Sequence, residues 1–291
     1  MGDSGGGRSA ADAIVPAVPW RVGGRMWDFR RPLVMGVLNA TPDSFSDGGE
    51  FMEPPLALAR AAELMEEGAD LIDLGGASSH PLAKPVSAQE ELRRVRPILE
   101  RLVKEVPLPL SIDTQKPEVA DACLKMGANL VNDVSGLTGP EMARVAARHG
   151  VPLVVMYNNF AVPRPPETPL PVAMAEFFTG RIALAEGEGA THLILDPGYG
   201  FGKTLAENME VLRSLGGLRN LRRPILVCTS RKGSLGRITG EKDPKQRLGA
   251  TLSASMYAAA QGAEMIRVHD VRAFQQALLT WRVIEEGPPL D

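Results

Sequence analysis

Polar residues stand directly after five short apolar segments of this 291-residue chain. They are Asn39, Asp113, Asn132, Asp196 and His269. A buried strand has no structural need to end on such residues. Carboxylates, amides and an imidazole can together hydrogen-bond a polar ligand and can hold or move protons. If the ends of these segments meet in space, the five side chains form one site.

The apolar segments are the predicted strands of a parallel sheet. They are short and rich in Val, Ile and Leu, and they alternate with longer amphipathic segments that predict helices. Eight such repeats favour closure into a barrel over an open sheet. The predicted strands are 33–38, 71–74, 108–112, 129–131, 152–156, 193–195, 225–228 and 265–268. The predicted helices are 57–67, 88–105, 117–126, 140–148, 171–188, 205–215, 246–261 and 272–286.

The sequence therefore predicts an α/β protein with a single (β/α)8 TIM barrel in residues 26–291. Residues 1–25 form a short N-terminal extension, which we expect to be partly disordered. In such a barrel the carboxyl ends of all strands open at one mouth, where active sites are built. The five polar strand-end residues should meet there.

Charge and composition exclude several classes of partner. The formal net charge is −3, and basic residues are interspersed with acidic ones, which argues against nucleic acid as the main partner. We find neither a long apolar run nor a signal segment, so we expect no membrane partner and a cytoplasmic location. Cys123 and Cys228 lie far apart in apolar runs, which predicts buried, reduced thiols.

Six motifs resemble those of the dihydropteroate synthase family of pterin-binding barrels. They occur in the order of that family, each at a predicted strand end, and the resemblance runs from about Leu33 to Trp281. The first motif and the one that begins at Asp196 are the most specific. The six motifs are Met35–Gly49, Ser111–Thr114, Val131–Asp133, Asp196–Lys203, Ser230–Lys232 and Arg267–Val271.

The resemblance implies a transferase that makes 7,8-dihydropteroate in folate biosynthesis. It would condense 6-hydroxymethyl-7,8-dihydropterin pyrophosphate with p-aminobenzoate and release pyrophosphate. Asp113, Asn132 and Asp196 would hold the pterin, whose edge carries adjacent donors and acceptors that such residues match pairwise. By the same resemblance, the remaining substrate-binding residues are Ser79, Phe201, Lys232, Arg267, Val268 and His269.

The residues expected at the leaving group lie on the last two strands. Arg267 and His269 are two positions apart, so both point to the same side of a strand. Together with Lys232 they occupy the region where barrels commonly bind phosphate. The resemblance implies that Asn39, Lys232, Arg267 and His269 are the catalytic residues and that Asn39 contacts Mg²⁺. One amide is a poor Mg²⁺ ligand, so the metal would arrive largely through the diphosphate and water. The family also implies a homodimer.

Two segments depart from the family pattern. The family motif Gly-Gly-Glu-Ser-Thr-Arg-Pro-Gly is here Gly75–Leu82, with Ala77, Ser79 and His80 at altered positions. The usual Met-His-Met after the fifth strand is Met156–Asn158. These changes affect the region expected to bind the amine. Two other functions therefore stay open: a non-catalytic pterin-binding paralogue, and a pterin-dependent methyltransferase-type barrel. The intact motifs at the diphosphate site argue against the methyltransferase.

Overall fold

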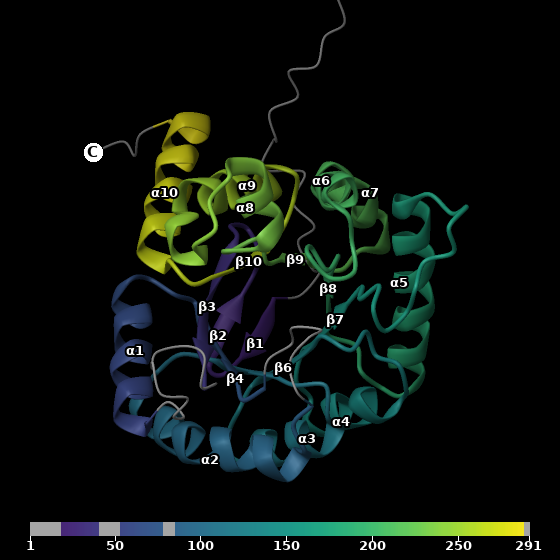
Figure 1. The fold of residues 1–291 in the computed structure, drawn as a ribbon. Helices are drawn as coiled ribbons and strands as arrows, with labels where there is room; N and C mark the ends of the chain where they lie inside the picture. Colours follow the sequence, from purple (N-terminus) through teal and green to yellow (C-terminus); the bar gives the residue numbers. More distant parts are fainter. Residues whose placement is uncertain (1–18, 41–52, 78–84, 288–291) are drawn as a thin grey trace, which may run out of the picture.

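A parallel barrel forms the body of the protein in the computed structural model, which describes residues 19–40, 53–77 and 85–287. Eight strands are hydrogen-bonded in the order β8-β7-β6-β5-β4-β3-β10-β9. The bridge between Leu195 and Ile225 joins the two ends of that order. The helices surround the strands as an outer ring (Figure 1). The predicted (β/α)8 barrel is confirmed.

The elements lie close to their predicted positions. The barrel strands are β3 (Leu33–Asn39), β4 (Leu71–Gly75), β5 (Leu110–Asp113), β6 (Leu130–Asp133), β7 (Leu153–Met156), β8 (Leu193–Asp196), β9 (Leu226–Val227) and β10 (Met265–Val268). The helices are α1 (Pro54–Glu66), α2 (Ala88–Glu105), α3 (Pro117–Lys125), α4 (Glu141–His149), α5 (Leu170–Gly187), α6 (Leu205–Arg213), α7 (Leu215–Leu218), α8 (Gly233–Thr239), α9 (Leu248–Ala260) and α10 (Val271–Glu286).

Side chains that alternate along each strand build two cores. On β10, Met265 belongs to the cluster inside the barrel, whereas Ile266 and Val268 pack in the cluster between strands and helices. This alternation follows from the two-residue period of a strand. Arg267 consequently shares the inner side with Met265. The inner apolar cluster fills the barrel towards the amino ends of the strands, and polar residues take over at the other end.

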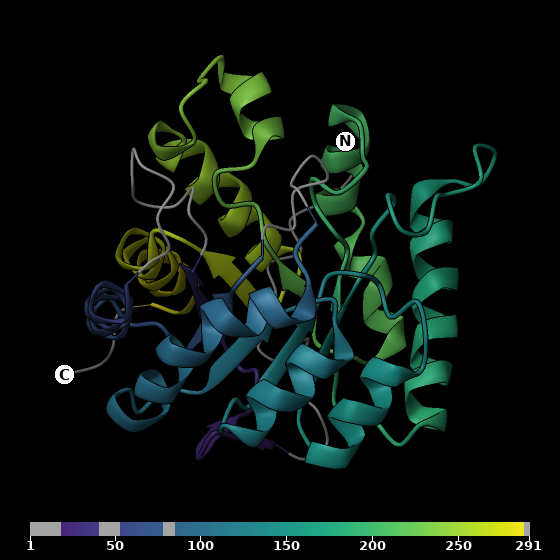
Figure 2. The same cartoon turned by 60° about the horizontal axis from the view of Figure 1, so that its bottom comes forward.

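An unpredicted hairpin covers the amino-terminal end of the barrel. Its strands are β1 (Trp20–Val22) and β2 (Arg25–Trp27), and Trp20, Val22 and Trp27 join the inner cluster. Figure 2 shows the hairpin in purple at the lower end of the barrel. It crosses the boundary expected at residue 25 and packs with the barrel. Residues 1–18 of the expected extension lie outside the described residues.

The remaining differences concern the last third of the chain. The seventh strand is shorter than expected, and α8 was not predicted. The helix expected over 205–215 ends at Arg213, and a second short helix, α7, follows Ser214. Gly216 and Gly217 lie within α7, and their low helix propensity agrees with its short length. Within the described ranges, no helix is both long and apolar enough to cross a membrane.

Candidate active site

A cavity of about 1270 Å³ lies at the carboxyl ends of the strands. Its wall brings together residues that are separated by more than two hundred positions in the chain. Most of the predicted site residues take part in this wall. They are Asn39, Asp113, Phe201, Lys232, Arg267 and His269.

Arg267 lies between two carboxylates at the centre of the site. Its Nε is 2.6 Å from Oδ2 of Asp73, and its Nη2 is 3.1 Å from Oδ2 of Asp113. Burial disfavours the charged guanidinium, but the two carboxylates outweigh burial and raise the pKa of Arg267 above its ordinary value. The third nitrogen, Nη1, is 3.8 Å from Sγ of Cys228. Two arms of the guanidinium that we expected to hold a diphosphate are therefore bound to carboxylates.

Asp113 ends β5 on the cavity wall and titrates near neutral pH. Burial raises its pKa from 3.8 to about 7; Arg267 opposes this rise, and the negative charge of Asp73 adds to it. Groups with pKa values shifted in this way are typical of sites that bind or transform a ligand. Asp113 can therefore offer either a carboxylate or a carboxylic acid to a ligand near pH 7.

Asn132 and Asp196 lie behind the cavity wall. Asn132 donates from Nδ2 to Oδ2 of Asp73 over 3.1 Å. Its buried Oδ1 has no hydrogen-bond partner within the described part of the chain, and buried polar atoms normally have one. Asp196 accepts a hydrogen bond from the backbone N–H of Gly198 over 2.7 Å, and burial raises its pKa. The free oxygen of Asn132 is an acceptor that a polar ligand can satisfy.

The loop after β8 supplies an aromatic surface beside a cation. Nζ of Lys232 lies 4.2 Å from the centroid of the Phe201 ring, a cation–π geometry. Gly198, Gly200 and Gly202 all have positive φ, which winds the loop tightly. Lys203 anchors this loop, because its Nζ donates to the carbonyl oxygens of Tyr157, Gly198 and Phe201 over 2.8 to 3.2 Å. Burial lowers the pKa of Lys203 to about 7. We had not predicted a role for this lysine.

Ser230 holds His269 at two points. The hydroxyl of Ser230 accepts a hydrogen bond from the backbone N–H of His269 over 3.2 Å, and it lies 2.9 Å from Nδ1 of the same residue. This contact orients the imidazole ring, whichever of its two nitrogens carries the proton. Burial is the main cause that lowers the pKa of His269 to about 3, and Arg231, Arg267, Lys232 and Arg60 add to it.

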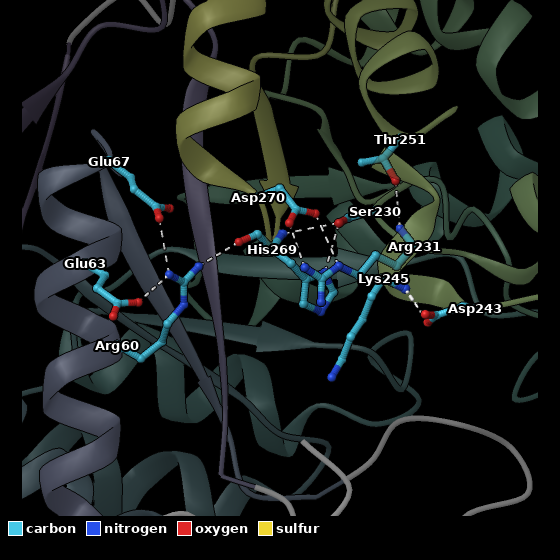
Figure 3. A network of polar contacts seen from close by, with 10 residues as sticks. All are labelled: Arg60, Glu63, Glu67, Ser230, Arg231, Asp243, Lys245, Thr251, His269 and Asp270. Carbon is cyan, nitrogen blue, oxygen red and sulfur yellow. Dashed lines mark hydrogen bonds and ion pairs between the residues drawn. The ribbon is translucent and has the colours of Figure 1, made fainter. Parts of the chain in front are cut away.

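Positive charge surrounds this neutral histidine (Figure 3). Arg60 on α1 donates to the carbonyl oxygen of His269 over 2.9 Å and also pairs with Glu63 and Glu67. Arg231 pairs with Asp270 over 2.6 Å and has a φ of 60°, an uncommon conformation for a residue other than glycine. A neutral donor among several cations is well suited to an anion.

Two further predicted substrate-binding residues, Val268 and Ser79, are not among the described residues that line the cavity. The side chain of Val268 is fully buried in the outer core, because strand alternation turns it away from Arg267. The side chain of Val268 therefore does not face the cavity, and a role of this residue in substrate binding stays a prediction. Ser79 lies outside the described residues, as does the neighbouring His80.

The altered pair after β7 has structural contacts. Tyr157 is buried against Phe177 and Phe178. Asn158 donates from Nδ2 to the carbonyl oxygen of Val134 over 2.9 Å and accepts from the backbone N–H of Phe160. Neither side chain lines the cavity. The departure from the family pattern at Tyr157 and Asn158 therefore affects the packing beneath the loop that follows β7.

The described residues offer few protein ligands for a metal. They contain no cluster of three or more His, Cys, Asp or Glu residues that could hold an ion. Asn39 Oδ1 and Asp113 Oδ2 both face Gly75, at 3.7 and 3.8 Å from the position that a Cβ would take there. Oxygen atoms are the ligands that Mg²⁺ prefers, but two are too few for its octahedral shell. The site fits Mg²⁺ only as an ion whose other ligands are diphosphate oxygens and water.

Comparison with known proteins identifies the family. Residues 35–269 match the model of the pterin binding enzymes. The chain is 42% identical to the dihydropteroate synthase of Synechocystis sp., over 91% of this chain and 94% of that protein. It is 38% identical to the Escherichia coli dihydropteroate synthase, over 90% and 94%.

The chain belongs to the dihydropteroate synthase family of pterin-binding enzymes.

Solved structures of this family share the fold. The Xanthomonas albilineans dihydropteroate synthase with 4-aminobenzoic acid superposes with a TM-score of 0.87 at 42% identity, over 93% of this chain and 99% of that chain. The same enzyme in complex with 7,8-dihydropteroate gives a TM-score of 0.84 at 41% identity, over 93% and 100%. The matches span nearly the whole length of these dihydropteroate synthases.

Proposed function

We propose that this chain condenses 6-hydroxymethyl-7,8-dihydropterin pyrophosphate with p-aminobenzoate to give 7,8-dihydropteroate and pyrophosphate. The observation that carries this proposal is the arrangement of one cavity. Carboxylates and an amide with a free oxygen lie beside it on one side, and a neutral histidine among cations lies on the other. A ligand with a polar heterocycle at one end and a diphosphate at the other matches both halves.

The heterocycle binds at the carboxylate side. Asp113 and the free Oδ1 of Asn132 accept hydrogen bonds from the ring N–H and amino groups, and Asp196 supplies a further carboxylate. Phe201 and the alkyl chain of Lys232 flank the ring. An analogue that lacks one of these donors would leave a buried acceptor unpaired, which gives steep discrimination.

The diphosphate binds near His269. The C–O bond to the exocyclic methylene breaks with its electron pair leaving on the diphosphate. The amine lone pair forms the new C–N bond, and the amine proton passes to pyrophosphate or water. The imidazole of His269, with Lys232 and the remaining arm of Arg267, stabilises the charge that develops on the leaving oxygens. Mg²⁺, bound to the diphosphate beside Asn39, would neutralise part of that charge. A methyl-transfer barrel would have no diphosphate for these groups to hold.

We also propose that the chain is cytoplasmic and forms a homodimer through α9 and α10, which pack side by side (Figure 1). Leu279 and Ile284 on α10 are 63% and 74% exposed, and Tyr257 on α9 is 43% exposed. Exposed apolar side chains on two neighbouring helices favour association. Sedimentation should show a dimer for the native chain and a monomer for Ile284→Glu. A native monomer would refute the dimer.

The decisive experiment is turnover of the purified chain. It is supplied with the pterin pyrophosphate, p-aminobenzoate and Mg²⁺, and both products are quantified. Equal amounts of dihydropteroate and pyrophosphate are expected. Tight pterin binding without turnover would instead indicate the non-catalytic paralogue. Turnover of a methyl-pterin without pyrophosphate release would indicate the methyltransferase.

A further inference from the structure

Asp73 is a fully buried carboxylate in the middle of β4. Its neighbours Ile72 and Leu74 are also fully buried, and Asp73 does not line the cavity. A buried carboxylate is costly unless it is paired and hydrogen-bonded. The contacts that offset this cost show what the residue does.

Asp73 accepts hydrogen bonds from three other strands of the barrel. Its Oδ2 accepts from Nε of Arg267 on β10 over 2.6 Å and from Nδ2 of Asn132 on β6 over 3.1 Å. Its Oδ1 accepts from Oγ of Ser111 on β5. One carboxylate thus contacts a residue of the pterin side and a residue of the diphosphate side.

These contacts determine the side-chain orientations of Asn132 and Arg267. An amide can be turned by half a rotation, and with Nδ2 held by Asp73 it is the oxygen of Asn132 that stays free. The reverse orientation would place the amide oxygen against a carboxylate oxygen. The bond to Nε orients the guanidinium of Arg267 so that Nη2 reaches Asp113. The negative charge of Asp73 also offsets the positive charge of the Arg267 guanidinium.

We propose that Asp73 is a positioning residue that couples the two halves of the site. It orients the amide of Asn132 towards the pterin, and it orients Arg267 while limiting the positive charge that a diphosphate meets. This inference rests on the proposed function, because it assigns the two ligands to the two halves.

Two substitutions separate hydrogen bonding from charge. Asp73→Asn keeps the shape: its Oδ1 can accept from Arg267 and Asn132, while its Nδ2 can donate to Ser111. It therefore removes the charge and keeps the three contacts, with the bond to Ser111 reversed in direction. Asp73→Ala removes the charge and all three bonds. Asp133→Asn is the matched control, because Asp133 is also fully buried but its hydrogen-bond donors are Ser135 and the backbone N–H of Leu137, which follow it closely in the chain.

The test is calorimetric binding of 6-hydroxymethylpterin and of inorganic pyrophosphate, measured separately on folded variants. Asp73→Ala should lose about tenfold or more in pterin affinity. Asp73→Asn should keep its pterin affinity within about threefold and gain about threefold or more in pyrophosphate affinity, because negative charge is removed. Asp133→Asn should leave both affinities within about threefold. A further Asp73→Ala change in an Asn132→Ala background should cost little more pterin affinity.

The outcomes distinguish the inference from the function on which it rests. If the native chain binds neither ligand, the proposed function fails, and this inference fails with it. If the native chain binds both ligands but a folded Asp73→Ala variant binds them equally well, only the inference is overturned. Equal losses in Asp73→Ala and Asp133→Asn would also overturn it, since the role would then be general packing. If Asp73→Ala does not fold, an unchanged pyrophosphate affinity in Asp73→Asn overturns the inference.

Discussion

The protonation of Asp113 gives a pH dependence whose sign can be derived from the structure. Burial raises its pKa from 3.8 to about 7. The folded protein therefore binds this proton more tightly than the unfolded chain does. The resulting stability is fully present below about pH 4 and is lost as pH rises through about 7. A rise of the pKa from 3.8 to about 7 changes the free energy of unfolding by on the order of 4 kcal/mol between the low-pH and the high-pH limit.

The substitution Asp113→Asn isolates this contribution, because asparagine has nearly the same shape and does not titrate. Chemical denaturation of both proteins at several values between about pH 5 and about pH 8 gives the difference in their free energies of unfolding. That difference should move in favour of the variant by about 2–3 kcal/mol as pH rises over this range. Glu90→Gln is a control of opposite kind, because the side-chain hydrogen bond from Arg93 and then that from Arg94 lower the pKa of Glu90 to about 2. Its difference should stay flat over this range.

A difference that stays constant with pH for Asp113→Asn would refute the reasoning, because Asp113 would then be ionised throughout.

Binding gives a second readout. The carboxylate form is the better acceptor for pterin donors, so the pterin affinity of the native chain should increase from about pH 6 to about pH 8. The affinity of the variant should not follow that rise.

Four further predictions concern other parts of the site. Ser230→Ala removes the acceptor for the backbone N–H of His269 and the hydrogen-bond partner of its Nδ1, so pyrophosphate affinity should fall about tenfold while pterin affinity holds. Equal losses for the two ligands would contradict this. Lys203→Met should loosen the Phe201 loop and weaken pterin binding by about 1–3 kcal/mol, which calorimetry would measure; an unchanged affinity would show that the loop holds without the lysine. Chelation of Mg²⁺ should abolish turnover, and full activity in excess EDTA would exclude a role for the metal. His80→Arg should lower the KM for p-aminobenzoate at about pH 8, where histidine is neutral; no change in this variant or in His80→Ala would mean that another residue supplies the cation.

Local patterns were enough to predict the barrel and the end that carries the site. The strands are short apolar runs between breakers, and this signal is contained in a few consecutive residues. Polar residues at the strand ends, such as Asp113 and His269, indicated the mouth because all strands of a parallel barrel point the same way. The hairpin at the other end was missed, although Gly23 and Gly24 between Trp20–Val22 and Arg25–Trp27 are a typical turn.

Only the tertiary structure decided how the polar groups are paired. Asp73 stands inside an apolar strand, and a charged residue there could have been noticed. Its partners, however, are 38, 59 and 194 positions away, so no local pattern names them. The same holds for the burial that raises the pKa of Asp113 to about 7, and for the burial and the surrounding cations that lower the pKa of His269. The residue types and strand ends are properties of the chain, whereas charge state and hydrogen-bond direction depend on which strands the closed barrel places together.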